Sequence, residues 1–296
     1  MKNEKSVKAQ KPKKWILCPG NYATGGVELL HQLAHEIDGT IWYRGGGQTP
    51  DAYEMYHNTV KTDKHPPQGA VVILPEIWAE MADEFERPVI YWESVDNYLI
   101  RKTKPIPDVE LHLTQSIYAY HFLREQGIPD EKIIPVTDYL HAAFMSPDKR
   151  HERLPLVLYN PAKGMEYTQR IIQSTPDIRF APIEKMTREE VIDKMDRARV
   201  YIDFGNHPGK DRLPREAAMR GLCVITGRNG SAPYDIDIPD LYKIERTDVE
   251  RIKGVIRMCV FNYEKYTKDF DGYRESIRGE YAQFREGCKR LLCALA

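Results

Sequence analysis

Side chains able to bind an anion gather in one segment that runs from Asp203 to Thr226. The segment reads DFGNHPGKDRLPREAAMRGLCVIT. Imidazole, ammonium and guanidinium groups are donors for phosphate or carboxylate, and a carboxylate in a first helical turn accepts hydrogen bonds from hydroxyls. The candidate side chains, all before or at the start of an apolar helix, are His207, Lys210, Arg212, Arg215 and Glu216. We predict a loop that holds a charged ligand at a helix start.

Glycine and proline shape this loop. Gly209 lets the chain fold tightly, while Pro208 and Pro214 stiffen it by fixing φ. After the next apolar run, GRNGSAPYD adds a second glycine loop, in which the backbone N–H groups around Gly230 and Ser231 could bind an anion.

Two other loops follow predicted strands and carry polar groups. NYATGG places Gly25 and Gly26 before a helix, where glycine lets a ligand approach and free N–H groups favour an anion. A tight strand-to-helix turn explains the same glycines equally well. YNPAKG places Asn160 and Lys163 on a turn, where the lysine can reach a phosphate or can simply be solvated.

A pair of carboxylates follows the predicted strand PVIYW. Glu93 and Asp96 lie in YWESVDNY, and the ligand crevice of an open α/β sheet lies at the carboxyl ends of its strands. An acid there can act as a base or bind sugar hydroxyls. An Asx turn capped by Asp96 or Asn97 is the structural alternative.

Strands and helices alternate along the chain, which indicates parallel α/β sheets. The apolar runs WILC, TIWY, AVVIL, PVIYW, LHLT and KIIPV read as strands of a first half, and helices are predicted at VELLHQLAHEI, PEIWAEMADEF and IYAYHFLREQ. The pattern restarts near His151 with LPLVLYN, IRFAPI, VYIDFG, LCVIT and LYKI as strands. Thr187 and Glu190 have capping-box spacing, and the aromatic stripe from Tyr263 to Tyr273 indicates packing in a helical C-terminal segment. The predicted parts are a basic flexible tail (1–14), a Rossmann-like domain (15–150) and a second one with C-terminal helices (151–296).

Composition describes a soluble globular protein. The chain has 296 residues and a net charge of −1, with 42% hydrophobic and 29% charged residues. No apolar run reaches the roughly 20 residues that span a bilayer, and five cysteines without CxxC spacing suit a reducing cytosol. We expect a cytoplasmic protein, with peripheral membrane contact as an alternative.

The first 14 residues are basic and the remainder is acidic. This segment has six lysines and one acidic residue, Glu4. The rest of the chain has 37 basic and 43 acidic residues. Such a tail can touch an anionic surface weakly, or it can simply be solubilising. An acidic body argues against a broad nucleic-acid groove, which must neutralise several phosphates.

The order NYATGGVELLHQLA, YNPAKG and YIDFGNHPGKDRLPREAAMRGLCVI resembles the GT-B glycosyltransferases, especially the retaining family 4 (group 1) enzymes that include sucrose and glycogen synthases. REAAMRGLCVI is similar to that family's LEAMAxGxPVI. The resemblance implies two Rossmann-like domains facing a crevice that holds a nucleoside-diphosphate sugar. It also implies sugar transfer, with retention, to a glycan, a lipid-linked glycan or another hydroxyl acceptor, as in polysaccharide synthesis, without a metal or other cofactor.

The resemblance assigns functional roles to the residues of this chain that match the family's motifs by position. Gly25 and Gly26 match the loop facing the donor phosphates and acceptor, Lys163 matches the pyrophosphate lysine, and Glu216 matches the carboxylate that holds the ribose. The family's arginine falls at Leu158 and its first motif glutamate at Pro208. His207, Lys210, Asp211 or Arg212 is the hypothesised replacement for those contacts.

Other functions stay open. A non-catalytic nucleotide-sugar or glycan-binding protein would keep the same scaffold. A sugar-nucleotide epimerase would use Glu93, Asp96 and His207 as acid and base around the sugar ring. A glycosyltransferase acting on a modified base in nucleic acid is a minor alternative.

Overall fold

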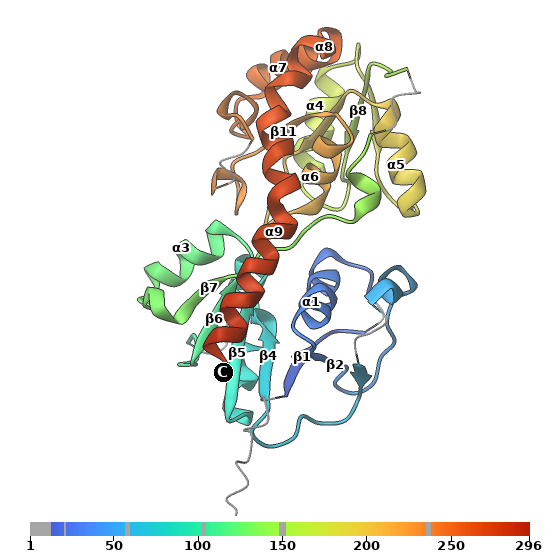
Figure 1. Ribbon diagram of the computed structural model, residues 1–296. Coiled ribbons are helices and arrows are strands. Elements are labelled where there is room, and N and C mark those ends of the chain that lie inside the picture. Colours follow the sequence, from blue (N-terminus) through green and yellow to red (C-terminus); the bar gives the residue numbers. More distant parts are fainter. Residues whose placement is uncertain (1–12, 21, 57–59, 102–104, 148–151, 235–237) are drawn as a thin grey trace, which may run out of the picture.

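Two parallel sheets form the frame of the molecule, one from each half of the chain (Figure 1). The structure is a computed structural model that describes residues 13–20, 22–56, 60–101, 105–147, 152–234 and 238–296. Residues 1–12 of the predicted basic tail lie outside these ranges, and Lys14 already begins a strand. The prediction of an α/β protein with parallel sheets is confirmed.

Within the described residues the first sheet has seven strands, in the order β3-β2-β1-β4-β5-β6-β7. They are β1 (Lys14–Leu17), β2 (Thr40–Trp42), β3 (Val60–Thr62), β4 (Val71–Pro75), β5 (Arg87–Trp92), β6 (Leu111–Thr114) and β7 (Ile133–Pro135). The described part of the second half forms a four-stranded sheet, in the order β11-β10-β8-β9. Its strands are β8 (Leu156–Tyr159), β9 (Arg179–Pro182), β10 (Val200–Asp203) and β11 (Cys223–Thr226).

Helices connect the strands and complete each half. The α-helices are α1 (Gly25–Glu36), α2 (Val95–Arg101), α3 (Ile117–Glu125), α4 (Met165–Ser174), α5 (Arg188–Arg197), α6 (Arg212–Met219), α7 (Val249–Phe261), α8 (Tyr263–Tyr266) and α9 (Asp271–Ala294). Short 3-10 helices cover Asp51–Tyr56, Glu76–Glu84, Asp130–Lys132, Ala142–Phe144, Ala232–Tyr234, Asp240–Tyr242 and Thr267–Phe270. No helix of the described chain is both long enough and apolar enough to cross a bilayer.

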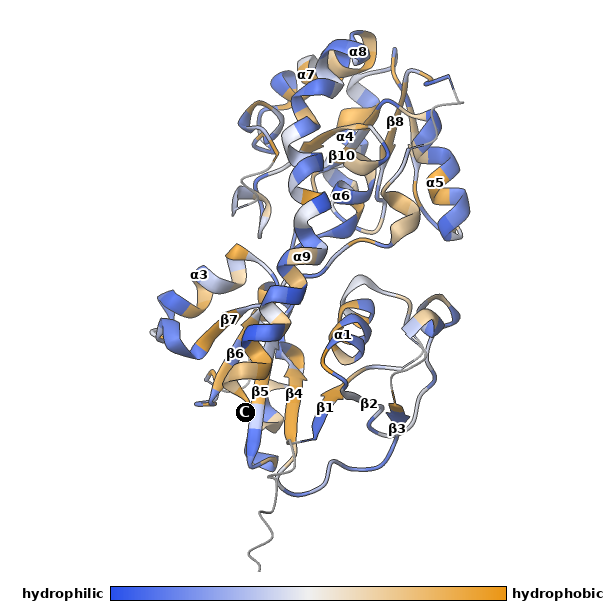
Figure 2. Ribbon diagram, in the orientation of Figure 1, coloured by the Kyte–Doolittle hydropathy of each residue, from blue (hydrophilic) through white to orange (hydrophobic). Residues whose placement is uncertain are grey.

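Alternating side chains of the first sheet enter different hydrophobic clusters. Val71 and Ile73 join one cluster, while Val72 and Leu74 join another on the opposite face. Burial on both faces explains the continuous apolar runs that mark these strands in the sequence, and the strands stand out as hydrophobic in Figure 2.

The last helix, α9, links the two halves. Tyr273 and Ile277 near its start pack in the core of the second sheet, whereas Phe284 and Leu291 pack in the core of the first. Figure 1 shows α9 running from one half down to β7, with the C-terminus beside the first sheet. A β-carbon on Gly287 would lie 2.5 Å from the carbonyl oxygen of Pro135, so this glycine permits the close approach.

Several local predictions are confirmed, two are wrong and one strand was not predicted. Thr187 and Glu190 form both bonds of a capping box, and the aromatic stripe packs in the second core. The strand Val60–Thr62 was missed. Glu76–Glu84 is a 3-10 helix interrupted at Trp78 instead of an α-helix, and the LYKI segment forms a 3-10 turn with a single bridge from Lys243 to Thr226.

Candidate functional site

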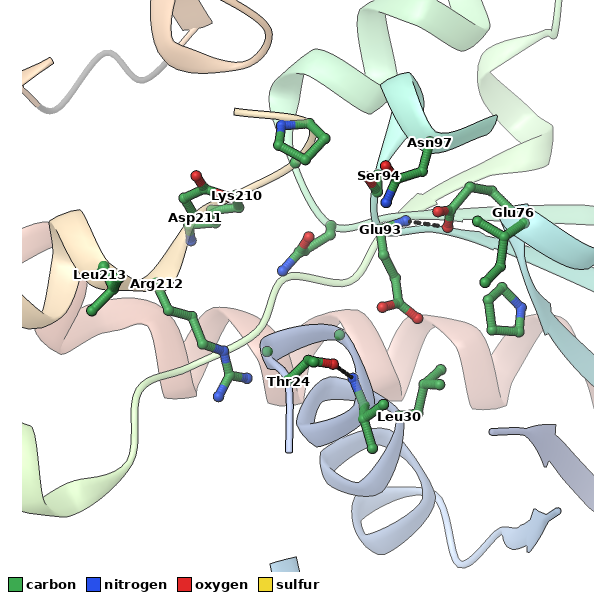
Figure 3. Close-up of a pocket in the computed structure, with 18 of the residues that line it drawn as sticks. Thr24, Leu30, Glu76, Glu93, Ser94, Asn97, Lys210, Asp211, Arg212 and Leu213 are labelled. Carbon is green, nitrogen blue, oxygen red and sulfur yellow. Dashed lines mark hydrogen bonds between the residues drawn. The ribbon is translucent and has the colours of Figure 1, made fainter. Parts of the chain in front are cut away.

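A cavity of about 490 Å³ lies where loops at the carboxyl ends of strands in both sheets meet (Figure 3). The first half lines it with the start of α1 and with residues after β4 and β5. The second half lines it with the turn after β8 and the loop before α6. The predicted site residues on its wall are Gly25, Gly26, Glu93, Asn160, Lys163, Gly209, Lys210 and Arg212.

Both predicted glycines at the start of α1 have a close neighbour across the cavity. A β-carbon on Gly25 would lie 3.0 Å from Cδ of Arg212, and one on Gly26 would lie 2.4 Å from Oε2 of Glu93. The side chain of Thr24 caps the helix by accepting from the N–H of Val27. The other N–H groups of this first turn lie at the cavity wall, where an anion is favoured.

A second carboxylate, Glu76, accompanies Glu93. The backbone N–H of Glu93 donates to Oε2 of Glu76 at 2.9 Å, and Oε1 of Glu93 is buried without a hydrogen-bond partner in the described structure. Burial raises the pKa of Glu76 to about 7; burial and the nearby Glu76 carboxylate raise the pKa of Glu93 well above its usual range. This pair can keep a proton near neutrality. Sequence reasoning missed Glu76, although it directly follows a buried strand just as Glu93 does.

Lys163 lies on the cavity wall and pairs with Asp211. The ammonium group contacts Oδ2 of Asp211, the residue that precedes α6. Gly164 has φ of +59°, and a β-carbon there would lie 2.8 Å from the backbone of Gly205. The YNPAKG turn is thus held against the loop after β10. Asn160 shapes the same turn by accepting from the N–H of Ala162 at 3.0 Å.

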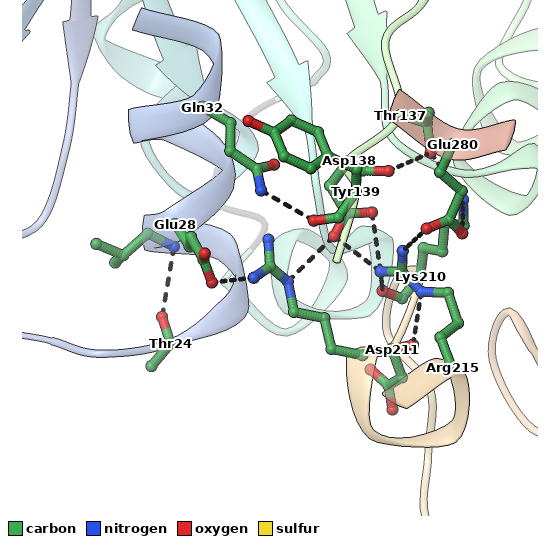
Figure 4. Close-up of polar contacts among 12 residues, drawn as sticks. Thr24, Glu28, Gln32, Thr137, Asp138, Tyr139, Lys210, Asp211, Arg215 and Glu280 are labelled. Atoms are coloured by element: carbon green, nitrogen blue, oxygen red, sulfur yellow. Dashed lines mark hydrogen bonds and ion pairs between the residues drawn. The ribbon is translucent and has the colours of Figure 1, made fainter. Parts of the chain in front are cut away.

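A buried network of ion pairs joins α6, α9 and the segment after β7 (Figure 4). Arg215 donates to both oxygens of Asp138, at 2.9 and 2.8 Å, and to Glu280 at 2.8 Å. Lys210 pairs with Glu280, also at 2.8 Å. Burial opposes ionisation of Asp138, but Arg215, Arg212 and Lys210 outweigh it and lower the pKa. Arg215, predicted to bind the ligand, therefore lies inside this network and not on the cavity wall.

Arg212 lies between this network and the cavity. Its guanidinium pairs with Glu28 of α1 and with Asp138, the latter at 3.1 Å, while Nη2 is buried without a partner in the described structure. Glu28, Asp138 and Glu280 were not predicted from the sequence. The arginines that pair with these three acids are 65 to 184 residues away in the chain, so no local pattern marks the acids.

Glu216 and Asp96 lie away from the cavity wall. Burial raises the pKa of Glu216 to about 7, and Arg212, one turn earlier on α6, partly offsets that rise. Asp96 accepts from the hydroxyl of Tyr118 at 2.6 Å and from the amide of Asn206 at 2.5 Å. Asp96 thus joins the two halves at the cavity's edge.

The second glycine loop, which contains Gly230 and Ser231, packs against the loop that contains His207 and Gly209. The N–H of Ser231 donates to the carbonyl of His207 at 2.7 Å, and its hydroxyl donates to the carbonyl of Gly209. Gly230 has φ of +63° and forms a bridge with His207. Gly230 and Ser231 therefore buttress the HPGK turn, and neither lies among the cavity-lining residues of the described chain.

His207 is buried behind the cavity wall, between two acids. Its Nε2 is 3.4 Å from Oδ1 of Asp203, and its Nδ1 is 3.9 Å from Oδ2 of Asp211. Burial opposes protonation, but Asp203 and Asp211 outweigh it and raise the pKa of His207. One ligand atom from each of the three residues lies within 4.8 Å of the other two, so the group could hold a metal ion.

Searches by sequence find no matching family model and no matching curated protein. The fold has clear structural neighbours. The chain is similar to HepE of Anabaena, solved with UDP and glucose, with a TM-score of 0.71, 9% identity and coverage of 95% of this chain and 99% of HepE. It is also similar to sucrose-phosphate synthase of Thermosynechococcus elongatus (TM-score 0.69, 12% identity, coverage 97% and 100%). A glycosyltransferase of Rickettsia africae gives a TM-score of 0.65 at 10% identity, with coverage of 97% and 99%.

Proposed function

We propose that the protein transfers a sugar from a nucleoside-diphosphate sugar to a hydroxyl acceptor. Its fold is of the GT-B type, with two parallel-sheet halves and a cavity between them. The observation that carries the proposal is the convergence on one cavity of the α1 start, three cations and a buried carboxyl pair. These are the groups that a diphosphate and a sugar need.

The diphosphate would bind at the start of α1. Lys163 and Arg212 come from the opposite side of the cavity, and each is paired with a carboxylate, Asp211 and Glu28 respectively. A diphosphate has more charge and more acceptor oxygens than either carboxylate, so it can replace them as partner of both cations. Stabilisation of the leaving diphosphate by such donors lowers the barrier to transfer.

The sugar would lie against Glu93. Its unpartnered Oε1 and the proton kept by the Glu76–Glu93 pair supply an acceptor and a donor for hydroxyl groups. A carboxyl group with a raised pKa also suits general acid or base catalysis near neutral pH. The sequence resemblance assigns the nucleotide ribose to Glu216, although Glu216 is not among the cavity-lining residues of the described chain.

The finer parts of the proposal depend on similarity alone. HepE was solved with UDP and with UDP-glucose, so uridine donors are the first candidates. Retention at the anomeric carbon, a glycan or lipid-linked acceptor, a role in surface polysaccharide and a cytoplasmic location are proposed from the family resemblance. That no cofactor is needed stays a prediction.

One observation favours a second candidate, a protein that binds a nucleotide sugar or glycan without turnover. Every cation on the cavity wall has an acidic partner in the described structure, so the cavity has little uncompensated positive charge. Such pairing would weaken the stabilisation of a leaving diphosphate.

The deciding experiment combines a thermal-shift screen with a donor-hydrolysis assay. The screen uses nucleoside diphosphates and nucleoside-diphosphate sugars. A ligand at a hundredfold excess over its dissociation constant stabilises the native state by about 2.7 kcal/mol. We expect one nucleotide sugar to raise the melting temperature and to be hydrolysed slowly, with both effects lost in Glu216→Ala. A shift without hydrolysis, even after acceptors are added, would favour the binding protein. Absence of any shift would contradict both sugar transfer and nucleotide-sugar binding, and would leave only glycan binding without turnover.

A further inference from the structure

Asp203, His207 and Asp211 form a cluster, here called the histidine cluster, on the wall of the second half. Asp203 ends β10, His207 lies in the following loop, and Asp211 precedes the first residue of α6. One ligand atom from each lies within 4.8 Å of the other two. Asp203 and Asp211 also line the cavity.

The imidazole of His207 is the unusual member of this cluster. Its side chain is 2% exposed, yet neither ring nitrogen makes a hydrogen bond within the described structure. Nε2 is 3.4 Å from Oδ1 of Asp203, beyond the usual N–H···O range of 2.7–3.2 Å. Buried polar atoms in proteins normally have a partner, so this ring requires an explanation.

The separation matches that of two ligands on one ion. Zinc binds nitrogen and oxygen at about 2.1 Å, and two such bonds at a tetrahedral angle put the ligand atoms roughly 3.4 Å apart. The measured separation of Nε2 and Oδ1 is 3.4 Å. The separation of Nε2 and Oδ1 is therefore of the right length for two ligands that share a cation.

The orientation of the Asp211 side chain is a second observation that points to a bound ion. An aspartate directly before a helix normally accepts from the N–H groups of the first turn, but Asp211 makes no such side-chain bond. Its Oδ2 instead contacts Lys163 and lies 3.9 Å from Nδ1 of His207, so it must move toward Nε2 to share an ion with Asp203 there. The carboxylate therefore faces the histidine cluster and does not cap α6.

We propose that the histidine cluster binds one divalent transition-metal ion, with zinc the best match to one imidazole and two carboxylates. Three protein ligands leave a fourth tetrahedral position, which a water or a phosphate oxygen from the cavity can fill. Lys163, whose side chain is 31% exposed, leaves Asp211 when the ion binds. This departs from the metal independence that the sequence resemblance implies. A contact between the ion and the donor diphosphate depends on the proposed function, whereas ion binding does not.

The test is metal binding by the full-length protein without nucleotide sugar. The exposed Cys293 is replaced by serine to remove an adventitious thiol ligand, and bound ions are removed with a chelator. Zn²⁺ is titrated by calorimetry, and Co²⁺ by its visible absorption, which distinguishes four-coordinate from hydrated ion. We expect one equivalent of either ion to bind and Co²⁺ to give a four-coordinate spectrum.

Variants assign the site. Asp211→Asn, which keeps the shape of a partly exposed side chain, should weaken binding at least tenfold, because even outer-shell partners of metal sites contribute 10–100-fold. His207→Ala should also weaken metal binding at least tenfold, and circular dichroism checks that this variant is folded. If His207→Ala unfolds, the result for Asp211→Asn tests the site. His121→Ala, an exposed histidine on α3, is the matched control and should bind as the parent does.

Failure of either proposal can be recognised separately. No binding at millimolar Co²⁺, or binding that Asp211→Asn leaves unchanged, would overturn the metal site whatever the donor screen shows. Metal binding by a protein that recognises no nucleotide sugar would leave the metal site standing and contradict the proposed function.

Discussion

The carboxyl group of Glu93 occupies the space that a side chain on Gly26 would need. A β-carbon on Gly26 would lie 2.4 Å from Oε2 of Glu93. The start of α1 and the end of β5 therefore approach more closely than any residue other than glycine would allow at position 26. The helix start that would bind phosphate and the carboxyl group that would face the sugar are thereby held on one wall.

Gly26→Ala tests this contact. The added methyl group must displace the Glu93 carboxyl, so we expect donor hydrolysis to fall at least about tenfold, since misplacement by 1 Å can cost on the order of 100-fold. The melting temperature should change little because the displaced group is a side-chain end. Gly254→Ala on α7 is the matched control, since its β-carbon has no neighbour within 4 Å. Unchanged hydrolysis in Gly26→Ala would remove Glu93 from the site.

The Glu76–Glu93 pair predicts how stability depends on pH. Burial raises the pKa of Glu76 from 4.5 to about 7. Between those values the native state holds a proton that the unfolded chain has lost, so the free energy of unfolding falls as pH rises through that window. Glu76 alone accounts for a fall on the order of 3 kcal/mol, and the raised pKa of Glu93 adds a fall in the same direction.

The measurement is urea denaturation of the wild type and of Glu93→Gln from pH 5 to pH 9. We expect the variant to be the more stable of the two at high pH, with the difference shrinking as pH falls. His31 and His112, whose pKa values burial lowers to about 4, act in the opposite direction at low pH. They contribute equally to both proteins and cancel in the difference. Parallel curves would mean that Glu93 is ionised in the native state.

Lys163→Ala tests the diphosphate contact. Removing a positioned donor to a leaving group typically costs about 100-fold or more in rate, and we expect that loss in kcat with the fold intact. Lys289→Ala is the control, because its side chain is 75% exposed on α9 and Lys289 is not among the cavity-lining residues of the described chain. A turnover number equal to the wild type's would contradict the role given to Lys163.

Arg215→Met tests whether the buried network is structural. The substitution removes the cation that bridges Asp138 and Glu280, and breaking a buried pair in this way costs on the order of 3 kcal/mol. The control is Arg278→Met, which removes an exposed pair with Glu275 and should change stability by less than about 1 kcal/mol. Equal stabilities of the two variants in urea would show that Lys210 and Arg212 suffice for both acids.

Local patterns in the sequence determined the elements and much of the cavity wall. Apolar runs marked ten of the strands. The glycines after β1 and the lysine after β8 lie on the cavity wall because the carboxyl ends of parallel strands share one edge of a sheet. The strand Val60–Thr62 was missed because its exposed and half-buried residues VKT lack an apolar run.

Only the tertiary structure decided which cation faces the ligand. Arg212 and Arg215 lie in the same turn of α6 and look equivalent in the sequence. Arg215 is buried because Asp138 and Glu280, 77 and 65 residues away, converge on it, whereas Arg212 reaches the cavity wall beside Gly25. The pairing of Glu76 with Glu93 and the histidine cluster arise in the same way. Charges interact through space, so a group's partners depend on the packing of distant segments and not on the residues next to it in the chain.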